Sequence, residues 1–87
     1  MAVARKQKHT AEEYAEELKS IIRARFPEAE FEFYKRPRRE YDLHVYGEFK
    51  GIFDILRLTS ERTTDILVDS GIHIHVLPLG RKPRNNS

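Results

Sequence analysis

The sequence predicts an α+β fold: a two-layer α/β sandwich in which two helices cover one face of a three-stranded mixed sheet. Three segments alternate apolar and polar residues, which is typical of strands with one buried face, and two segments carry apolar residues at helical spacing. Along the chain these segments follow the order α-β-β-α-β. With 87 residues the chain forms one domain with a modest core, so a partner or self-association would add to its stability.

The first helix is expected over residues 11–25. Thr10 followed by Glu13 forms a capping box, in which each side chain binds the backbone N–H of the other residue. Pro27 ends the helix because proline cannot continue it. The apolar stripe that should face the core consists of Tyr14, Leu18, Ile21, Ile22 and Phe26.

Three strands are expected, over 29–34, 41–46 and 72–77, with Pro78 ending the third. The apolar positions are Ala29, Phe31, Phe33, Tyr41, Leu43, Val45, Ile72, Ile74 and Val76. A basic loop with one proline, Arg36-Pro37-Arg38-Arg39, connects the first two strands. If both helices lie on one side of the sheet, its other face gathers Glu30, Glu32, Tyr34, Asp42, His44, Tyr46, His73 and His75.

The second helix is expected over residues 52–69. Its apolar stripe consists of Ile52, Ile55, Leu56, Thr59, Thr63, Ile66 and Leu67. Gly71 suits the left-handed position that follows a helix. An alternative makes 52–58 a strand that pairs with the second strand through Lys50-Gly51, because GIFDILRL is rich in β-branched and aromatic residues.

The composition limits the classes of protein to consider. The chain has no cysteine, which excludes disulfides, thiolate zinc sites and cysteine nucleophiles and fits a reducing cytoplasm. No apolar run approaches about 18 residues, and the N-terminus lacks the apolar core of a signal peptide, so we expect a cytoplasmic protein without a membrane span. We expect a flexible basic arm over 1–9, one domain over 10–79 and a disordered basic tail over 80–87; basic ends either bind a polyanion or are simply solvated.

The polar face raises the question of a site. One interpretation is a zinc-type metal site made of His44, His73 and His75 with Asp42 as a fourth ligand, and Glu40 precedes the same strand. The other interpretation is a solvated face with exposed or interface histidines, in which Asp42 pairs with Arg38 or Arg39.

Two stretches, REYDLHVYG (39–47) and DILRLTSERTTDILVDSGIHIHVLPL (54–79), resemble the DNA polymerase β-like nucleotidyltransferases in their minimal prokaryotic form. The resemblance covers about residues 10–79 and implies that the Asp42 strand lies beside the third strand. It further implies that Glu40 and Asp42 are catalytic and hold Mg²⁺ ions, which activate a hydroxyl and neutralise a triphosphate. The side chains implied to bind the phosphates are Lys35, Arg36, Arg38 and Arg39.

The chain departs from that family in three places. FYKRPRRE (33–40) replaces the Gly-Ser turn, Glu40 replaces the first aspartate, and His73 or His75 replaces an acid of the third strand. Imidazole suits zinc, nickel or copper better than magnesium. We therefore expect a nucleotidyltransferase-fold protein with impaired catalysis, which acts with a helical protein partner, as in toxin–antitoxin pairs, or binds a nucleotide or phosphate. The alternatives are a non-enzymatic nucleic-acid-binding module that uses loop 35–39 and the tails, and a metal-binding dimer or higher oligomer built on the histidine face.

Overall fold

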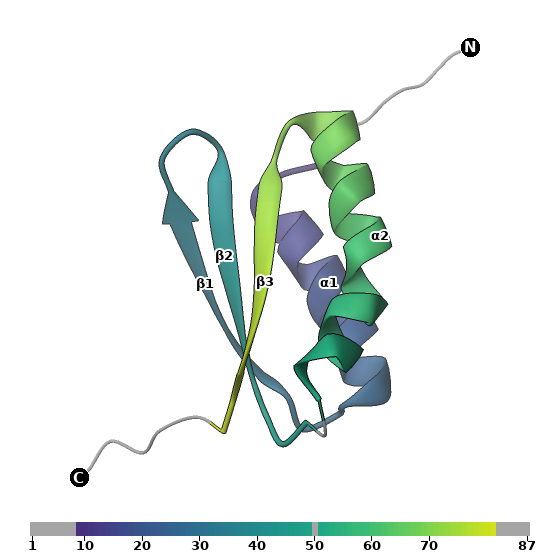
Figure 1. Cartoon of the computed structure of the whole chain (residues 1–87). Helices are drawn as coiled ribbons and strands as arrows, with labels where there is room; N and C mark the ends of the chain where they lie inside the picture. Colours follow the sequence, from purple (N-terminus) through teal and green to yellow (C-terminus); the bar gives the residue numbers. More distant parts are fainter. Residues whose placement is uncertain (1–8, 50, 82–87) are drawn as a thin grey trace, which may run out of the picture.

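A computed structural model describes residues 9–49 and 51–81 and confirms the predicted α+β sandwich (Figure 1). Its elements are α1 (Ala11–Arg25), β1 (Glu30–Arg36), β2 (Glu40–Tyr46), α2 (Ile52–Ser70) and β3 (His73–Gly80). Most of the expected arm over 1–9 and of the expected tail over 80–87 lies outside the described residues. Neither α1 nor α2 is long and apolar enough to cross a membrane.

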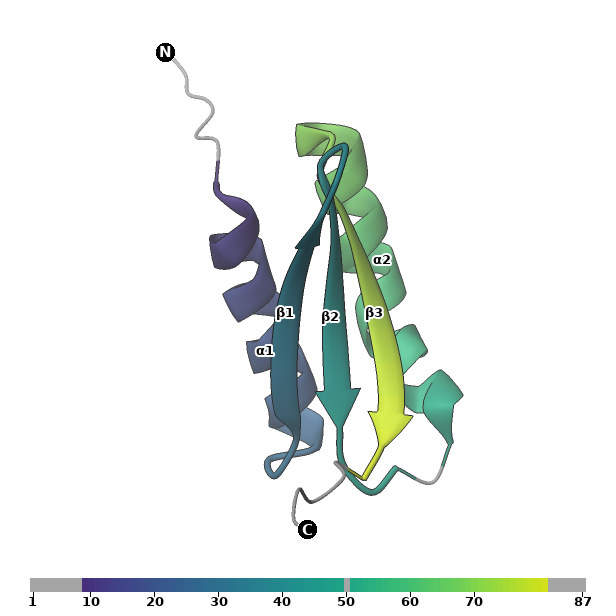
Figure 2. The same ribbon diagram turned by 90° about the vertical axis from the view of Figure 1, so that its left-hand side faces the viewer.

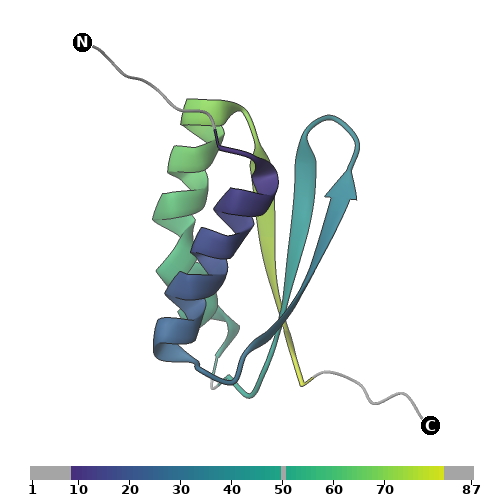
Figure 3. The same cartoon turned by 180° about the vertical axis from the view of Figure 1, so that it is seen from behind.

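The three strands form one sheet in the order β1-β2-β3 (Figure 2). β1 and β2 form an antiparallel hairpin, whereas β2 and β3 run parallel and are connected through α2. The sheet is therefore mixed, and β2 is its central strand. Seen from behind, α1 and α2 lie next to each other on the same face of the sheet (Figure 3). Among residues 9–49 and 51–81, no helix lies over the opposite face. We call this opposite face the uncovered face.

Helix α1 begins and ends where its sequence signals predict. The Thr10 hydroxyl accepts from the Glu13 amide at 3.1 Å, and the Glu13 carboxylate accepts from the Thr10 amide at 2.9 Å. These two bonds satisfy amides that have no partner inside the helix. At the other end the helix stops at Arg25, two residues before Pro27.

Helix α2 covers residues 52–70 without a break, so the alternative strand over 52–58 is wrong. Gly71 follows it with φ 76°, and its amide donates to the Leu67 carbonyl at 2.8 Å. Within the predicted stripe, Ile55, Thr59 and Ile66 are buried, but Leu67 is 38% exposed. Leu67 follows directly after Ile66, so the rotation of one helical position turns it away from the sheet.

The core lies between the sheet and the two helices. Leu18 and Ile22 of α1 are fully buried there, as are Leu43 and Val45 of β2 and Ile55 of α2. Phe33 and Tyr41 stack on each other across the hairpin with ring centroids 5.3 Å apart. These are the faces that the period-two and helical patterns assign to the core.

Strand β3 does not end at Pro78, as the sequence had led us to expect, but continues to Gly80. Proline is tolerated there because β3 is an edge strand, so the missing N–H need not bind a second neighbour. The register with β2 shifts between Val45 and Tyr46, and the Gly80 carbonyl then accepts from the Gly47 amide at 2.8 Å.

Candidate metal centre on the uncovered face

The uncovered face is organised in rows of side chains that run across the three strands. Partner residues of neighbouring strands place Arg36, Glu40 and His73 in one row. Tyr34, Asp42 and His75 form the next row, and Glu32, His44 and Leu77 the one after. Successive rows are about 7 Å apart, because residues on one face of a strand are two positions apart. The sequence-predicted site residues of β2 and β3 therefore do share this face.

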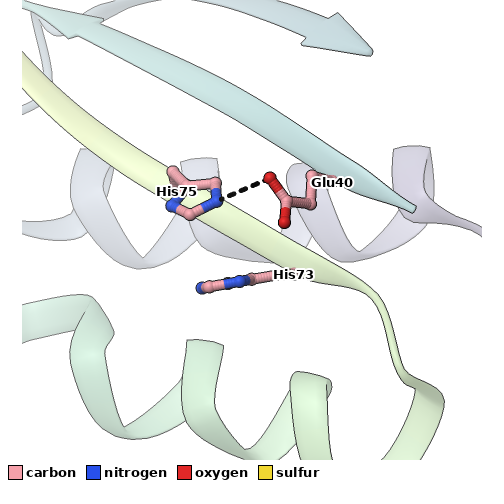
Figure 4. Close-up of side chains that lie close together, drawn as sticks. All are labelled: Glu40, His73 and His75. Atoms are coloured by element: carbon pink, nitrogen blue, oxygen red, sulfur yellow. Dashed lines mark ion pairs between the residues drawn. The ribbon is translucent and has the colours of Figure 1, made fainter. Parts of the chain in front are cut away.

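Glu40, His73 and His75 bring three potential metal ligands together (Figure 4). One ligand atom of each residue lies within 4.8 Å of the ligand atoms of the other two. His75 Nε2 is 3.6 Å from Glu40 Oε1, and the two imidazole rings lie 3.9 Å apart at 35°. All three residues are half-buried, so solvent and a ligand can reach the cluster from the uncovered face.

The backbone explains why these three residues meet. Glu40 is the first residue of β2 and His73 the first of β3, and the parallel register pairs them directly. His75 lies two positions further along β3 and so projects from the same face. A metal within this triad would therefore be held by the central strand and one edge strand, both of which are anchored in the core.

Asp42 is directed away from this triad. The side chain of Asp42 is only 12% exposed, and its carboxylate accepts from Arg36 Nη1 at 3.0 Å. The expected alternative partners were Arg38 and Arg39, but Arg36 is the residue on the same sheet face, one row away on β1. Within the described part of the chain, the cluster compatible with a metal includes Glu40 and excludes Asp42.

His44 belongs to a second polar cluster, which lies on the β1–β2 part of the uncovered face. Its Nδ1 is 3.5 Å from the Tyr46 hydroxyl, and its ring contacts the Tyr34 ring at a centroid distance of 4.8 Å. The Glu32 carboxylate accepts from the Tyr34 and Tyr46 hydroxyls at 2.5 and 3.1 Å. The hydrogen bond to Glu32 raises the pKa of Tyr34 because it stabilises the protonated phenol. Sequence reasoning did not anticipate this network, although the shared face of Glu32, Tyr34 and Tyr46 was visible in the alternation.

The four basic residues of loop 35–39 do not form a single cradle. Arg36 binds Asp42, whereas Arg39 Nη2 donates to the Ser70 carbonyl at the end of α2, at 2.8 Å. Arg38 is exposed in the turn, and Lys35 projects from β1 on the side opposite to Arg36. Only Arg36 therefore lies on the uncovered face, in the row of Glu40 and His73.

Two imidazoles and one carboxylate form a donor set typical of transition metals, above all of zinc sites that keep a fourth position for water or substrate. The same set suits Mg²⁺ poorly, because Mg²⁺ prefers oxygen ligands only. No family model matches this chain, and searches of curated proteins and of solved structures found no match either.

Proposed function

We propose that this protein binds a divalent transition-metal ion through Glu40, His73 and His75, and that the open coordination position receives a phosphate-bearing ligand. The observation that carries the proposal is the convergence of the three ligand atoms within 4.8 Å on the uncovered face. The metal would supply Lewis-acid polarisation of a bound oxygen. The three side chains would hold it, and the core beneath β2 and β3 would keep them in place.

The position of Arg36 favours a negatively charged ligand at the proposed metal. Its side chain is 57% exposed, and of its five N–H donors one is committed to Asp42. A divalent ion together with Arg36 outweighs the carboxylates of Glu40 and Asp42 by one positive charge. An oxyanion that bound the metal could also accept from Arg36, which stands one strand away from Glu40 in the same row.

Under this proposal the protein differs in its metal and in its activity from the nucleotidyltransferases that its sequence resembles. We propose one transition metal in place of two Mg²⁺ ions, and a nucleotide or phosphate that is bound without efficient transfer. Action beside a protein partner, or as a dimer, also stays a proposal, supported by the modest core of an 87-residue chain.

Isothermal titration calorimetry with zinc tests the metal site. We expect one zinc ion per chain and a loss of affinity of at least about tenfold in His73→Ala. His44→Ala is the matched control, because His44 lies on the same face but outside the triad. Equal zinc affinity in His73→Ala and in the wild type would refute the site.

Titration of inorganic phosphate into the zinc-loaded protein tests the ligand. We expect binding that depends on zinc and weakens by about tenfold in Arg36→Gln, since a charge-assisted hydrogen bond contributes roughly 1.5–3 kcal/mol. Lys35→Gln serves as the control on the same strand but the opposite face. Phosphate binding that is indifferent to zinc and to Arg36 would contradict this part of the proposal.

A further inference from the structure

We propose that Arg39 is the positioning residue of the metal centre: it fixes Glu40 against His73 from the helix side of the sheet without touching the ligand atoms. This inference rests on the proposed metal site. It starts from the contacts of Arg39, which bind the hairpin between β1 and β2 to the junction of α2 and β3.

The backbone of Arg39 makes the first contact. Its carbonyl accepts from the His73 amide at 3.1 Å. Glu40 follows Arg39 directly in the chain, so this bond lies beside the backbone of Glu40 and His73, the residues that supply the carboxylate and the first imidazole of the triad. It fixes the register in which the first residues of β2 and β3 pair, and the triad depends on this register.

The side chain of Arg39 makes the second contact. Its guanidinium donates to the Ser70 carbonyl at 2.8 Å. The last turn of α2 has no basic residue of its own, so Arg39 brings a positive charge to a helix end whose carbonyls carry partial negative charge. The guanidinium also lies against the turn itself, since a Cβ on Gly71 would be 3.9 Å from Arg39 Cζ.

Other bonds make this junction stiff. The Ser70 hydroxyl donates to the Ile66 carbonyl at 2.6 Å and accepts from the Ile72 amide at 3.1 Å. Gly71 adopts the left-handed conformation with φ 76°. The segment that leads into His73 is thus fixed to α2, and Arg39 fixes it to the hairpin.

The hairpin turn allows the effect of backbone strain to be separated from the effect of the Arg39 side chain. Arg38 and Arg39 have φ values of 63° and 62°, in a region that favours glycine or asparagine over other residues. A glycine at position 39 would relieve this strain, but it would also remove the contact with Ser70. Arg38 has the same strained conformation and is exposed in the turn, so it offers a matched control.

Zinc affinity of the folded full-length chain tests the inference. The variants are Arg39→Gly, Arg39→Lys and Arg38→Gly, compared by competition with a chromophoric chelator at a temperature at which circular dichroism shows each of them folded. We expect Arg39→Gly to lose about tenfold or more in zinc affinity, as is usual for partners that orient metal ligands. Arg39→Lys, which keeps the charge near Ser70, should recover most of the loss, and Arg38→Gly should stay within about twofold of the wild type.

The outcomes separate the two proposals. If the wild type binds no zinc, the proposed function fails and the inference fails with it. If the wild type binds zinc and Arg39→Gly binds it equally well, only the positioning role is refuted. Should Arg39→Gly not fold, Arg39→Asn takes its place, because asparagine also tolerates the left-handed conformation. Amide hydrogen exchange at His73 gives a metal-free readout: faster exchange in the Arg39 variant alone supports the role, and unchanged exchange contradicts it.

Discussion

Two acids that are two positions apart on one strand differ in their contacts because each has a different neighbour. Glu40 and Asp42 project from the same face of β2, yet Glu40 lies 3.6 Å from His75 while Asp42 binds Arg36. The shorter side chain of Asp42 is nearly buried and is neutralised by its arginine, whereas the Glu40 side chain is 46% exposed. At the residue scale, the partner on the neighbouring strand decides the role of each acid: Arg36 makes Asp42 a structural carboxylate, and His75 makes Glu40 a candidate ligand.

This separation predicts opposite effects for two similar substitutions. Glu40→Gln should lower zinc affinity by about tenfold or more, because a neutral amide is a much weaker ligand, and should change stability little at this half-exposed position. Asp42→Asn should leave zinc affinity within about twofold and lower stability by about 1 kcal/mol, because its partner Arg36 is more than half exposed to solvent. Calorimetric zinc titrations and urea unfolding of both variants check this, and a larger loss of zinc in Asp42→Asn would contradict it.

At the scale of single elements, the cap of α1 links helix stability to pH. The backbone N–H of Thr10 holds the pKa of Glu13 below its usual 4.5. A carboxyl group whose pKa is lower in the folded state stabilises the fold above the unfolded value and loses this contribution as pH falls through the folded value. The contribution of Glu13 should therefore be complete at neutral pH and decline as pH falls below the usual value of 4.5.

We expect Glu13→Gln to be less stable than the wild type at pH 7 and the difference to become smaller as pH falls from 4.5 to 3. Thermal melts at the two pH values measure this, with Glu12→Gln, in the same turn but outside the capping box, as the control. A difference that persists unchanged at pH 3 would show that the charge of Glu13 is not what matters. Thr10→Ala, which removes the other half of the box, should cost about 1 kcal/mol at pH 7.

The strands contribute buried side chains to the core, and truncation of these side chains should lower stability strongly. Leu43 and Ile74 are 0% and 2% exposed on the helix side of β2 and β3. We expect Leu43→Ala or Ile74→Ala to cost about 2–4 kcal/mol through lost burial and an unfilled cavity, a large share of the stability of a small domain. Leu77→Ala, on the uncovered face and 36% exposed, should cost much less. Urea denaturation of the three variants tests the assignment of faces, and equal losses would overturn it.

The elements were predictable from the sequence because their signals are local. Alternation in 41–46, the capping box at Thr10 and the glycine at position 71 each specify structure within a few residues. The end of β3 was not predictable in this way, since Pro78 is tolerated because β3 is an edge strand of the sheet that the described residues form. The carboxylate of the metal triad likewise depends on the register between strands 33 positions apart and on the direction in which Glu40 and Asp42 lean, neither of which the sequence states.

At the scale of the whole molecule, the expected fold is present, but a different connection stands where the nucleotidyltransferases that the sequence resembles have their Gly-Ser turn. The hairpin connection consists of Pro37, Arg38 and Arg39, without a glycine to bring successive backbone amides around a phosphate chain. Arg39 of this connection binds the end of α2, and Arg36, the last residue of β1, binds Asp42. Under the proposed function this arrangement would receive an anion at the metal, whereas a connection without glycine is poorly suited to hold a triphosphate with backbone donors during transfer.

We therefore predict no robust nucleotide transfer by the isolated chain. Each missing transition-state donor costs about 3 kcal/mol, which is more than a hundredfold in rate. Incubation with radiolabelled nucleotides, in Mg²⁺ and separately in Zn²⁺, should yield no labelled protein or RNA at an enzyme-like rate. Label that appears at such a rate and vanishes in Glu40→Ala, which removes a ligand of the proposed metal site, would show that this conclusion is wrong.

The parallel pairing of β2 and β3 has a consequence for the folding reaction. Glu40 and His73 are separated by 33 positions, and the whole of α2 lies between them. An unfolded chain rarely brings two such distant residues together, so the complete triad comes into existence only after the crossover helix has docked. A metal that binds this triad acts as a reversible cross-link over that long segment and favours the native state by mass action, by about 2.7 kcal/mol at a free concentration one hundred times its dissociation constant. Under the proposed function, the ion would thus be the last component to join the fold, and it would stabilise the folded chain as its site fills.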